Sequence, residues 1–281
     1  MIDDVGRLEQ RADELRAEGW LDAAARAYAE LLAIAPGHLK AERLLSSLAG
    51  RESALPSAPG GLKPAPFVVV RQLLPPEVHD ALLACFLSKA DEFGAAATTE
   101  GLHRDYRRSM ILPDCFGHVA PELKEAFYGQ LLAHWPKARV RLRVSEFEPL
   151  LSETHALLYR DGDFFASHRD TGPNNTRRVT FLYNLHRTPR QFHGGDLLLY
   201  DTYFRPGDGK SGPEQPRFAE TCTRLVPEDN RLVFFPSEFY HEVSPVSDVG
   251  EDLAGARFAI NGWLHTSREG GDLDHIAFTP Y

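Results

Sequence analysis

Hydrophobic residues in the first part of the chain recur at helical spacing, and this pattern then stops. Residues 1–49 are rich in alanine, leucine, glutamate and arginine, with a break at Pro36-Gly37. Residues 50–66 have no period and are dominated by serine, proline and glycine, which is typical of a linker. We therefore predict a small helical hairpin over 1–49, a linker over 50–66 and a main domain over 67–281.

The main domain begins with helical spacing and continues with short strand-like runs. Apolar side chains three or four positions apart predict helices over 75–93 and 120–135, and we expect Pro136 to end the second helix. Turn residues bound each of the β-rich runs. The predicted strands are 67–70, 154–159, 178–185, 196–200, 231–235 and 257–264. Short strands after a pair of helices favour a mainly β, α+β fold, in which helices support one face of an antiparallel double sheet.

Several residues in the predicted hairpin fall at the positions of a tetratricopeptide repeat. The matching residues are Ala12, Leu15, Gly19, Ala24, Tyr28, Leu31 and Pro36. Small side chains let two antiparallel helices approach closely, but arrays of such repeats usually need about three copies to bury a continuous core. A single repeat must therefore pack against another surface to bury its apolar side chains. Either it caps the main domain, or residues 1–49 associate with a partner or with a second copy of the chain.

The charge balance argues against nucleic acid as a partner. The 281 residues include 31 Lys and Arg against 40 Asp and Glu, a formal net charge of -9, whereas a polyphosphate ligand normally requires a basic surface. No apolar run approaches the roughly 18 residues of a membrane span, and the acidic first four residues are unlike a secretory signal. We expect a cytoplasmic protein without membrane contact. We also expect reduced packing cysteines at Cys85, Cys115 and Cys222, which form no metal-binding pair.

The strongest local candidate for chemistry is the motif His168-Arg169-Asp170. Residues two apart in a strand point to the same side, so an imidazole and a carboxylate can reach one ion. His241 follows the apolar run 232–235, and two histidines with one carboxylate form the set that leaves open positions on a non-haem Fe(II). The alternative stays open here. Composition alone produces about one such three-residue motif, and His241 by itself is typical of a hydrogen-bonded loop histidine.

A cation is predicted near the last of these candidates. In the final strand, alternation places Arg257 and Asn261 on one face and Phe258 on the other. A guanidinium that faces a barrel interior is costly to bury unless it meets an anion, and its fork fits a carboxylate. We interpret Arg257 as the residue that binds an acid. The alternative is a rim arginine paired with Glu251 or Asp252.

Together these motifs resemble the 2-oxoglutarate- and Fe(II)-dependent dioxygenases, in particular the prolyl 4-hydroxylase-like branch. They follow one another in the family's order over about residues 67–265. The matching stretches are Tyr159 to Phe165 leading to His168-Arg169-Asp170, Arg178-Val179-Thr180, Gly194-Gly195-Asp196-Leu197, Leu232-Val233-Phe234-Phe235 before His241, and Arg257 through Trp263. The resemblance implies a double-stranded β-helix, or jelly-roll, core.

The resemblance also implies a role for each candidate residue. The implied catalytic iron ligands are His168, Asp170 and His241. Arg257 would bind the distal carboxylate of 2-oxoglutarate, and Tyr159, nine residues before the first ligand, matches a tyrosine that hydrogen-bonds the same cosubstrate. Asn184 and Asn261 stand where relatives often carry a tyrosine or threonine near the cosubstrate, and we count Asn261 with the binding residues. The implied cofactors are Fe(II), 2-oxoglutarate and O2, with ascorbate as an additional reductant.

The implied activity is hydroxylation of an unactivated C–H bond with release of succinate and CO2. The first hypothesis is an enzyme that acts on a peptide or protein side chain, as prolyl hydroxylases do. The second is a hydroxylase of a free amino acid or secondary metabolite, and the third is a non-catalytic module whose hairpin recruits partners. Residues 202–218 have no period, and we expect a long loop there that helps to select the substrate.

Overall fold

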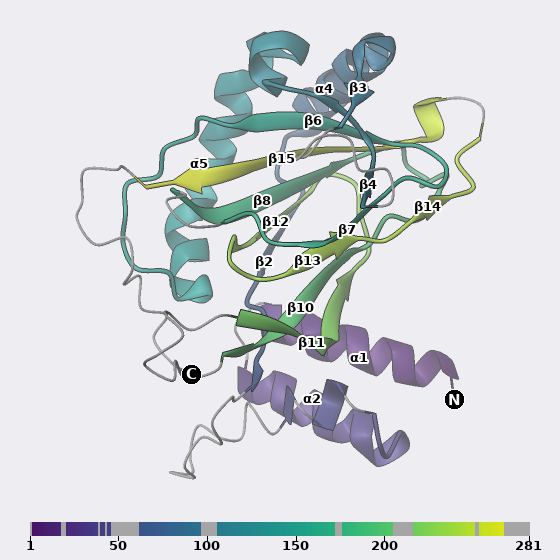
Figure 1. The fold of residues 1–281 in the computed structure, drawn as a ribbon, viewed down its shortest axis with the longest axis vertical. Coiled ribbons are helices and arrows are strands. Elements are labelled where there is room, and N and C mark those ends of the chain that lie inside the picture. The colour runs from purple at the N-terminus through teal and green to yellow at the C-terminus, as the bar shows by residue number, and fades with distance from the viewer. Residues whose placement is uncertain are drawn as a thin grey trace.

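A computed structural model describes most of the chain. The described residues are 2–17, 21–38, 40–42, 44–45, 62–96, 106–171, 176–204, 216–250 and 253–266. Helices α1 (Ile2–Ala17) and α2 (Leu21–Ile34) lie side by side at one end of the molecule, next to strands β10 and β11 (Figure 1). Among the described residues, no helix combines the length and hydrophobicity needed to cross a bilayer.

The main domain consists of two antiparallel sheets that face each other, as the strand pattern predicted. Sheet A runs in the order β1 (Leu62–Lys63), β10 (Leu197–Phe204), β13 (His241–Val243), β7 (Phe164–His168) and β4 (Arg107–Arg108), with β11 (Pro216–Leu225) also paired to β10. Sheet B runs in the order β2 (Val68–Arg71), β12 (Arg231–Pro236), β8 (Arg177–Leu185), β15 (Arg257–His265), β6 (Thr154–Tyr159), β5 (Met110–Leu112) and β3 (Gly94–Ala95). A small pair joins β14 (Val246–Ser247) to β9 (His193–Gly194). The mainly β, α+β fold with a jelly-roll core is confirmed.

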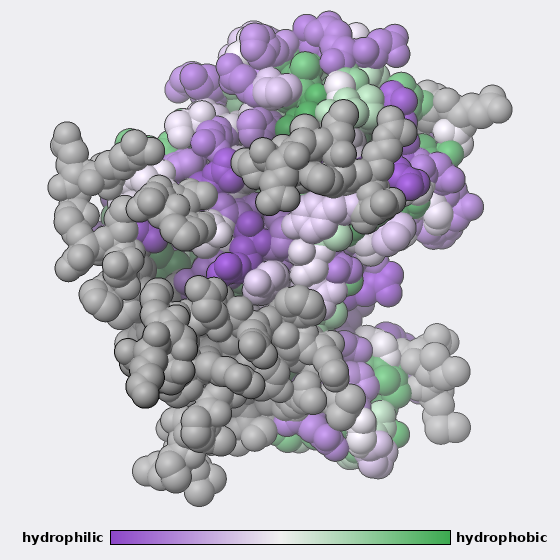
Figure 2. Space-filling model, in the orientation of Figure 1, coloured by the Kyte–Doolittle hydropathy of each residue, from purple (hydrophilic) through white to green (hydrophobic). Residues whose placement is uncertain are grey.

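Sheet B separates two hydrophobic clusters, because its side chains alternate between its faces. On the outer face, helices α4 (Pro76–Ser88) and α5 (Lys124–Leu142) pack against the sheet (Figure 1). Phe258 and Ile260 of β15 belong to this outer cluster, whereas Ala259 belongs to the cluster between the two sheets. The face of β15 that carries Arg257 therefore points into the space between the sheets. Strongly hydrophilic side chains lie at and to the left of the middle of the face seen in Figure 2.

The structure corrects two sequence predictions about element boundaries. Helix α5 continues through Pro136 to Leu142, although the proline was expected to end it. Loss of one backbone hydrogen bond is tolerated because Pro136 is exposed, while Ala138 and Leu142 extend the buried stripe of the helix. The predicted loop 202–218 is partly strand, since β10 continues to Phe204 and β11 begins at Pro216.

The amino-terminal helices form a cluster of their own. Tyr28, Leu31 and Ala24 are fully buried in it, and the Tyr28 hydroxyl donates to Asp13 at 2.5 Å. The tetratricopeptide likeness of residues 1–49 stays a prediction. The predicted linker over 50–66 lies outside the described residues up to 61, and its end contributes strand β1 to sheet A. Arg71 of β2 pairs with Glu14 of α1 at 3.4 Å, so the helices contact the main domain.

Candidate metal and cosubstrate site

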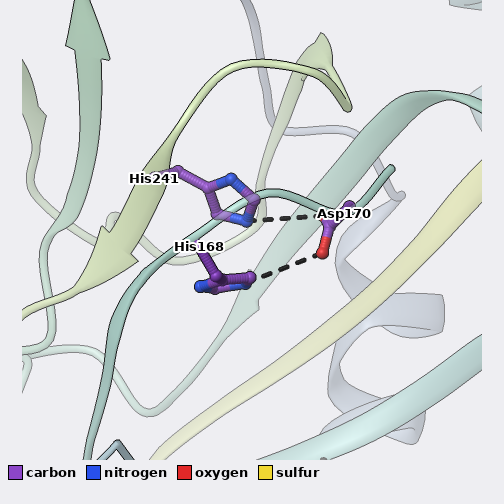
Figure 3. A group of neighbouring side chains, drawn as sticks. All are labelled: His168, Asp170 and His241. Atoms are coloured by element: carbon purple, nitrogen blue, oxygen red, sulfur yellow. Dashed lines mark ion pairs between the residues drawn. The ribbon is translucent and has the colours of Figure 1, made fainter. Parts of the chain in front are cut away.

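Three side chains from two strands converge between the sheets. His168 ends β7 and His241 begins β13, and these two residues are directly opposite each other in the antiparallel pair. Asp170 follows β7 closely, and its carboxylate lies 3.6 Å from Nε2 of His168 and 3.4 Å from Nε2 of His241 (Figure 3). The structure therefore brings together the three residues that the sequence singled out as ligands.

Hydrogen bonds fix the orientation of both imidazoles. Nδ1 of His168 donates to the carbonyl of Ala166 at 2.8 Å, and Nδ1 of His241 donates to the carbonyl of Phe239 at 3.1 Å. Because a carbonyl can only accept, the proton of each neutral ring sits on Nδ1 and the lone pair sits on Nε2. Burial lowers the pKa of His168 to about 3, so this ring is neutral near pH 7. Nε2 of His168 is thus free to bind a cation, and the Nδ1 bond of His241 turns the Nε2 of that ring toward the same place.

The third side chain is held in its charged form. The Thr180 hydroxyl donates to Oδ2 of Asp170 at 2.7 Å and lies 2.9 Å from the Ser237 hydroxyl. Burial alone would raise the pKa of Asp170, but the imidazoles of His241 and His168 and the Thr180 hydroxyl together hold it below its usual range. A carboxylate with one oxygen fixed in this way keeps its remaining lone pairs for an ion.

The donor set fits a transition-metal ion such as Fe(II). One ligand atom from each of His168, Asp170 and His241 lies within 4.8 Å of the other two. Atoms about 2.1 Å from one ion and at right angles to each other lie about 3 Å apart, close to the nitrogen–oxygen separations found here. Two neutral imidazoles and one carboxylate on one side of the ion leave its other positions open.

A buried arginine lies on sheet B, across from sheet A. Arg257, at the start of β15, has no exposed surface, and its Nε and Nη1 have no hydrogen-bond partner among the described residues. Its Nη2 donates to Oδ1 of Asn184 at 3.4 Å, and its Cζ lies 4.6 Å from the centre of the Tyr159 ring. Burial lowers the pKa of Arg257, which reflects the cost of a desolvated cation. Full burial shows that Arg257 is not exposed at the rim, while Glu251 and Asp252, the partners in the alternative interpretation, lie outside the described residues. Its Nε and Nη1, which have no partner among the described residues, fit an acid such as the carboxylate of 2-oxoglutarate.

The other predicted binding residues lie on the same inner face. Tyr159 is opposite Arg257 in the pair of β6 and β15, and Asn261 is opposite His155 in the same pair. Oδ1 of Asn261 is buried and lacks a hydrogen-bond partner among the described residues. Tyr159 therefore contacts the arginine directly, whereas Asn261 lies two strand repeats further along β15.

Sequence reasoning did not assign roles to several residues that shape the site. Thr180 and Ser237 orient the aspartate, and Phe165 stacks on His168 with ring centres 3.6 Å apart. Gly195 leaves room for Arg257, because a Cβ there would lie 2.5 Å from Cδ of the arginine. The adjacent glycines 194 and 195 indicate that another segment approaches the backbone closely, but the sequence does not show that this segment carries Arg257.

Comparison with known proteins shows which family this part of the chain is similar to. Residues 154–265 match the family model of the 2OG-Fe(II) oxygenase superfamily. A curated relative, an uncharacterized PKHD-type hydroxylase of Synechocystis sp., is 29% identical over 203 residues. The match covers 72% of this chain and 63% of that protein, so the chain spans less than two thirds of the relative's length.

Solved structures share the fold of this chain. A prolyl-4-hydroxylase of Pseudomonas putida superposes with a TM-score of 0.50 at 24% identity, covering 72% of this chain and 93% of that chain. A prolyl hydroxylase of Trichoplax adhaerens, in complex with a peptide fragment of hypoxia inducible factor, has a TM-score of 0.54 at 18% identity and covers 71% and 83%. The superfamily uses Fe(II), 2-oxoglutarate and O2, as the resemblance predicted. Residues 154–265 are therefore similar to the 2OG-Fe(II) oxygenase superfamily of oxidoreductases, and the two solved prolyl hydroxylases share the fold of this chain.

Proposed function

We propose that this protein hydroxylates an unactivated C–H bond in a peptide or protein side chain, using Fe(II), 2-oxoglutarate and O2. In this proposal the iron ligands are His168, Asp170 and His241. Arg257 binds the distal carboxylate of 2-oxoglutarate. The observation that carries the proposal is the combination of a three-ligand cluster with a fully buried arginine whose Nε and Nη1 have no partner among the described residues.

Each residue has a task that follows from its surroundings. The bound iron and cosubstrate supply the oxidising power. The Nδ1 bonds of His168 and His241 orient both rings so that their Nε2 atoms point at one position, and Thr180 holds the carboxylate of Asp170 beside them. Fixing these ligands before metal binding lowers the entropic cost of forming the centre.

The cosubstrate pocket is built to hold an anion away from water. Arg257 supplies the positive charge, and the Asn184 oxygen fixes one of its terminal nitrogens. The ring of Tyr159 lies beside the guanidinium, and we assign its hydroxyl and the Asn261 amide to polar contacts with 2-oxoglutarate. Because the arginine is desolvated, its interaction with a carboxylate is stronger than the same pair would be in water.

The assignment to a peptide substrate follows the relatives. The curated relative is described as a hydroxylase, and the structural neighbour from Trichoplax adhaerens binds a peptide fragment. Residues 1–49 offer a further surface for a polypeptide or for self-association. The competing substrate class is a free amino acid or other small metabolite.

Anaerobic titration with Fe(II) and then 2-oxoglutarate tests the site. We expect a weak visible charge-transfer band in the parent protein. His168→Ala should lose iron binding, and Arg257→Ala should keep iron but lose cosubstrate affinity. His118→Ala, at an exposed histidine away from the cluster, is the matched control and should behave as the parent. If both site variants bind iron and 2-oxoglutarate as the parent does, the assignment is wrong.

The substrate class needs a separate experiment. Peptides from a cell lysate are incubated with the loaded enzyme in air, and mass spectrometry identifies those that gain one oxygen atom. Free amino acids are tested in parallel for stimulation of succinate release. Oxidised peptides support the proposal, and stimulation by small molecules alone contradicts the peptide assignment.

A further inference from the structure

Arg107 of strand β4 lies next to the candidate metal ligands and was not needed to build the site. It is opposite Phe165 in the pair of β4 and β7, and its Cζ lies 4.4 Å from the centre of that ring. Phe165 in turn stacks on His168, with ring centres 3.6 Å apart and an angle of 18° between the planes. Arg107 is therefore one aromatic ring away from a proposed iron ligand.

Arg107 lies on the inner face of sheet A, because Phe165 directly opposite it packs against the hydrophobic cluster between the sheets. Burial is the main cause that lowers the pKa of His155 on β6, and the positive charges of Arg177 and Arg107 lower it further. His155 is opposite Asn261 on the inner face of sheet B, and its ring contacts that of Trp263 at 5.6 Å. The positive charge of Arg107 therefore lies on the inner side of sheet A and acts on His155 of sheet B.

Arg107 differs from Arg177 in having no acidic partner among the described residues. Arg177 pairs with Glu153 and lies over the ring of Trp263 at 3.6 Å. Nε of Arg107 donates to the Ser109 hydroxyl at 3.0 Å, but no carboxylate lies within 4 Å of its guanidinium among the described residues. Among the described residues this cation therefore has no counter-ion, although the chain as a whole has 40 acidic residues.

An uncompensated cation beside a metal centre is unfavourable by itself. It repels the bound Fe(II), and it is half-buried, so solvent screens the repulsion only in part. Fe(II), the Asp170 carboxylate and the Arg257 guanidinium together carry a net charge of +2. The two carboxylates of 2-oxoglutarate would neutralise this charge. The positive charge of Arg107 remains, and an anionic group of the substrate would balance it.

We propose that Arg107 binds a carboxylate of the substrate, so that the enzyme selects an acidic substrate, with the carboxylate close to the oxidised C–H bond. This inference rests on the proposed function. The planar guanidinium is held by Phe165 and Ser109, and this leaves its terminal nitrogens to form a fork for a carboxylate. The carboxylate can belong to an Asp or Glu side chain of a peptide or to a small organic acid.

The neighbouring Arg108 provides a matched control. It is opposite Phe164 in the same strand pair, and alternation turns its side chain to the other face of β4. Arg108 is exposed, and its Cζ lies 5.8 Å from the Phe164 ring. Replacement of Arg108 therefore removes one positive charge from the same strand without removing the cation that faces the site.

Binding is measured calorimetrically on anaerobic protein loaded with Fe(II) and 2-oxoglutarate. One arm uses capped peptides with a central proline and a single Glu placed at successive positions, each compared with its Gln counterpart. The other arm compares free glutamate with glutamine and free aspartate with asparagine. In at least one arm we expect the acid to bind about tenfold tighter than its amide, the magnitude of a charge-assisted hydrogen bond.

The variants decide whether Arg107 causes this preference. Arg107→Gln should abolish it, Arg107→Lys should retain part of it, and Arg108→Gln should leave it unchanged. The arm that shows the preference identifies the source of the carboxylate. Absence of acid preference in both arms, or a preference that persists in Arg107→Gln, overturns the inference. Loss of the visible band in the parent protein would instead contradict the proposed function, and Arg107→Gln should keep that band.

Discussion

Gly195 offers a direct test of how tightly the proposed cosubstrate pocket is built. Its φ is +68°, a left-handed conformation that costs an alanine about 1–2 kcal/mol. A Cβ at this position would lie 2.5 Å from Cδ and 3.0 Å from Nε of Arg257, and 3.0 Å from Cγ2 of Val246. These atoms are inside the molecule, since Arg257 is fully buried and Val246 is 1% exposed. Gly195→Ala must therefore displace the arginine.

The expected loss follows from the contact that is displaced. A hydrogen bond to a charged group contributes about 1.5–3 kcal/mol, so a misplaced Arg257 should weaken 2-oxoglutarate binding by roughly 10- to 100-fold. Iron affinity should change little, because Gly195 does not contact the three proposed ligands. The free energy of unfolding should fall by about 1–2 kcal/mol from the backbone conformation alone.

The assay combines anaerobic titration of 2-oxoglutarate with denaturant unfolding. Gly129→Ala in helix α5 is the control, because a Cβ there meets nothing within 4 Å. That substitution should stabilise the protein by about 0.5–1 kcal/mol and leave cosubstrate binding unchanged. If Gly195→Ala binds 2-oxoglutarate as tightly as the parent, Arg257 is not held as described or does not bind the cosubstrate.

Three further predictions concern the support of the site and the core. Thr180→Val removes the hydroxyl that holds Asp170 and should weaken metal binding by about 10-fold, measured by Fe(II) titration; unchanged affinity would contradict this role. Burial raises the pKa of the Cys115 thiol above its ordinary value of 9.0, so the folded state keeps a proton that the unfolded state releases. Stability should therefore fall above about pH 9, by up to about 1.4 kcal/mol per pH unit, and Cys115→Ala should show a smaller slope in denaturation at pH 8, 9 and 10. His79→Leu removes hydrogen bonds to the Tyr183 hydroxyl at 2.6 Å and to Asp229 at 2.9 Å, so the free energy of unfolding measured in urea should fall by about 2 kcal/mol. An unchanged free energy of unfolding would contradict this role.

The sequence predicted strands β2, β6, β8, β12 and β15 of sheet B because this part of the sheet is covered on both faces, but it did not predict the short strands β3 and β5. Strand β6 has the predicted bounds, and β8, β12 and β15 differ from prediction by one residue at an end. Continuous apolar runs bounded by turn residues are readable without any knowledge of partners. Strand β11 was not predicted, since its sequence mixes charged and apolar residues and, among the described strands, it pairs only with β10. Pro136 misled the prediction because a buried stripe outweighed the propensity of one residue.

Local sequence predicted which side chains of the candidate site share a face, and the family resemblance added His241 to them. The two-residue spacing of His168 and Asp170 and the alternation along β15 both indicate which side chains share a face. The structure brings His241 to the first pair and turns Arg257 inward. Contacts that depend on pairing between distant strands, such as Arg107 with Phe165, have no local signal.

Strand β15 divides its side chains between two tasks, which limits how this protein can change during evolution. Substitutions such as Phe258→Leu alter only the helical side, where a repacked neighbour can compensate. Deletion of a single residue within the strand would turn the guanidinium of Arg257 toward the helices and bring an aromatic ring into the anion pocket. Natural variation in this strand should therefore consist of replacements at constant length, while insertions and deletions accumulate in the connections at its ends.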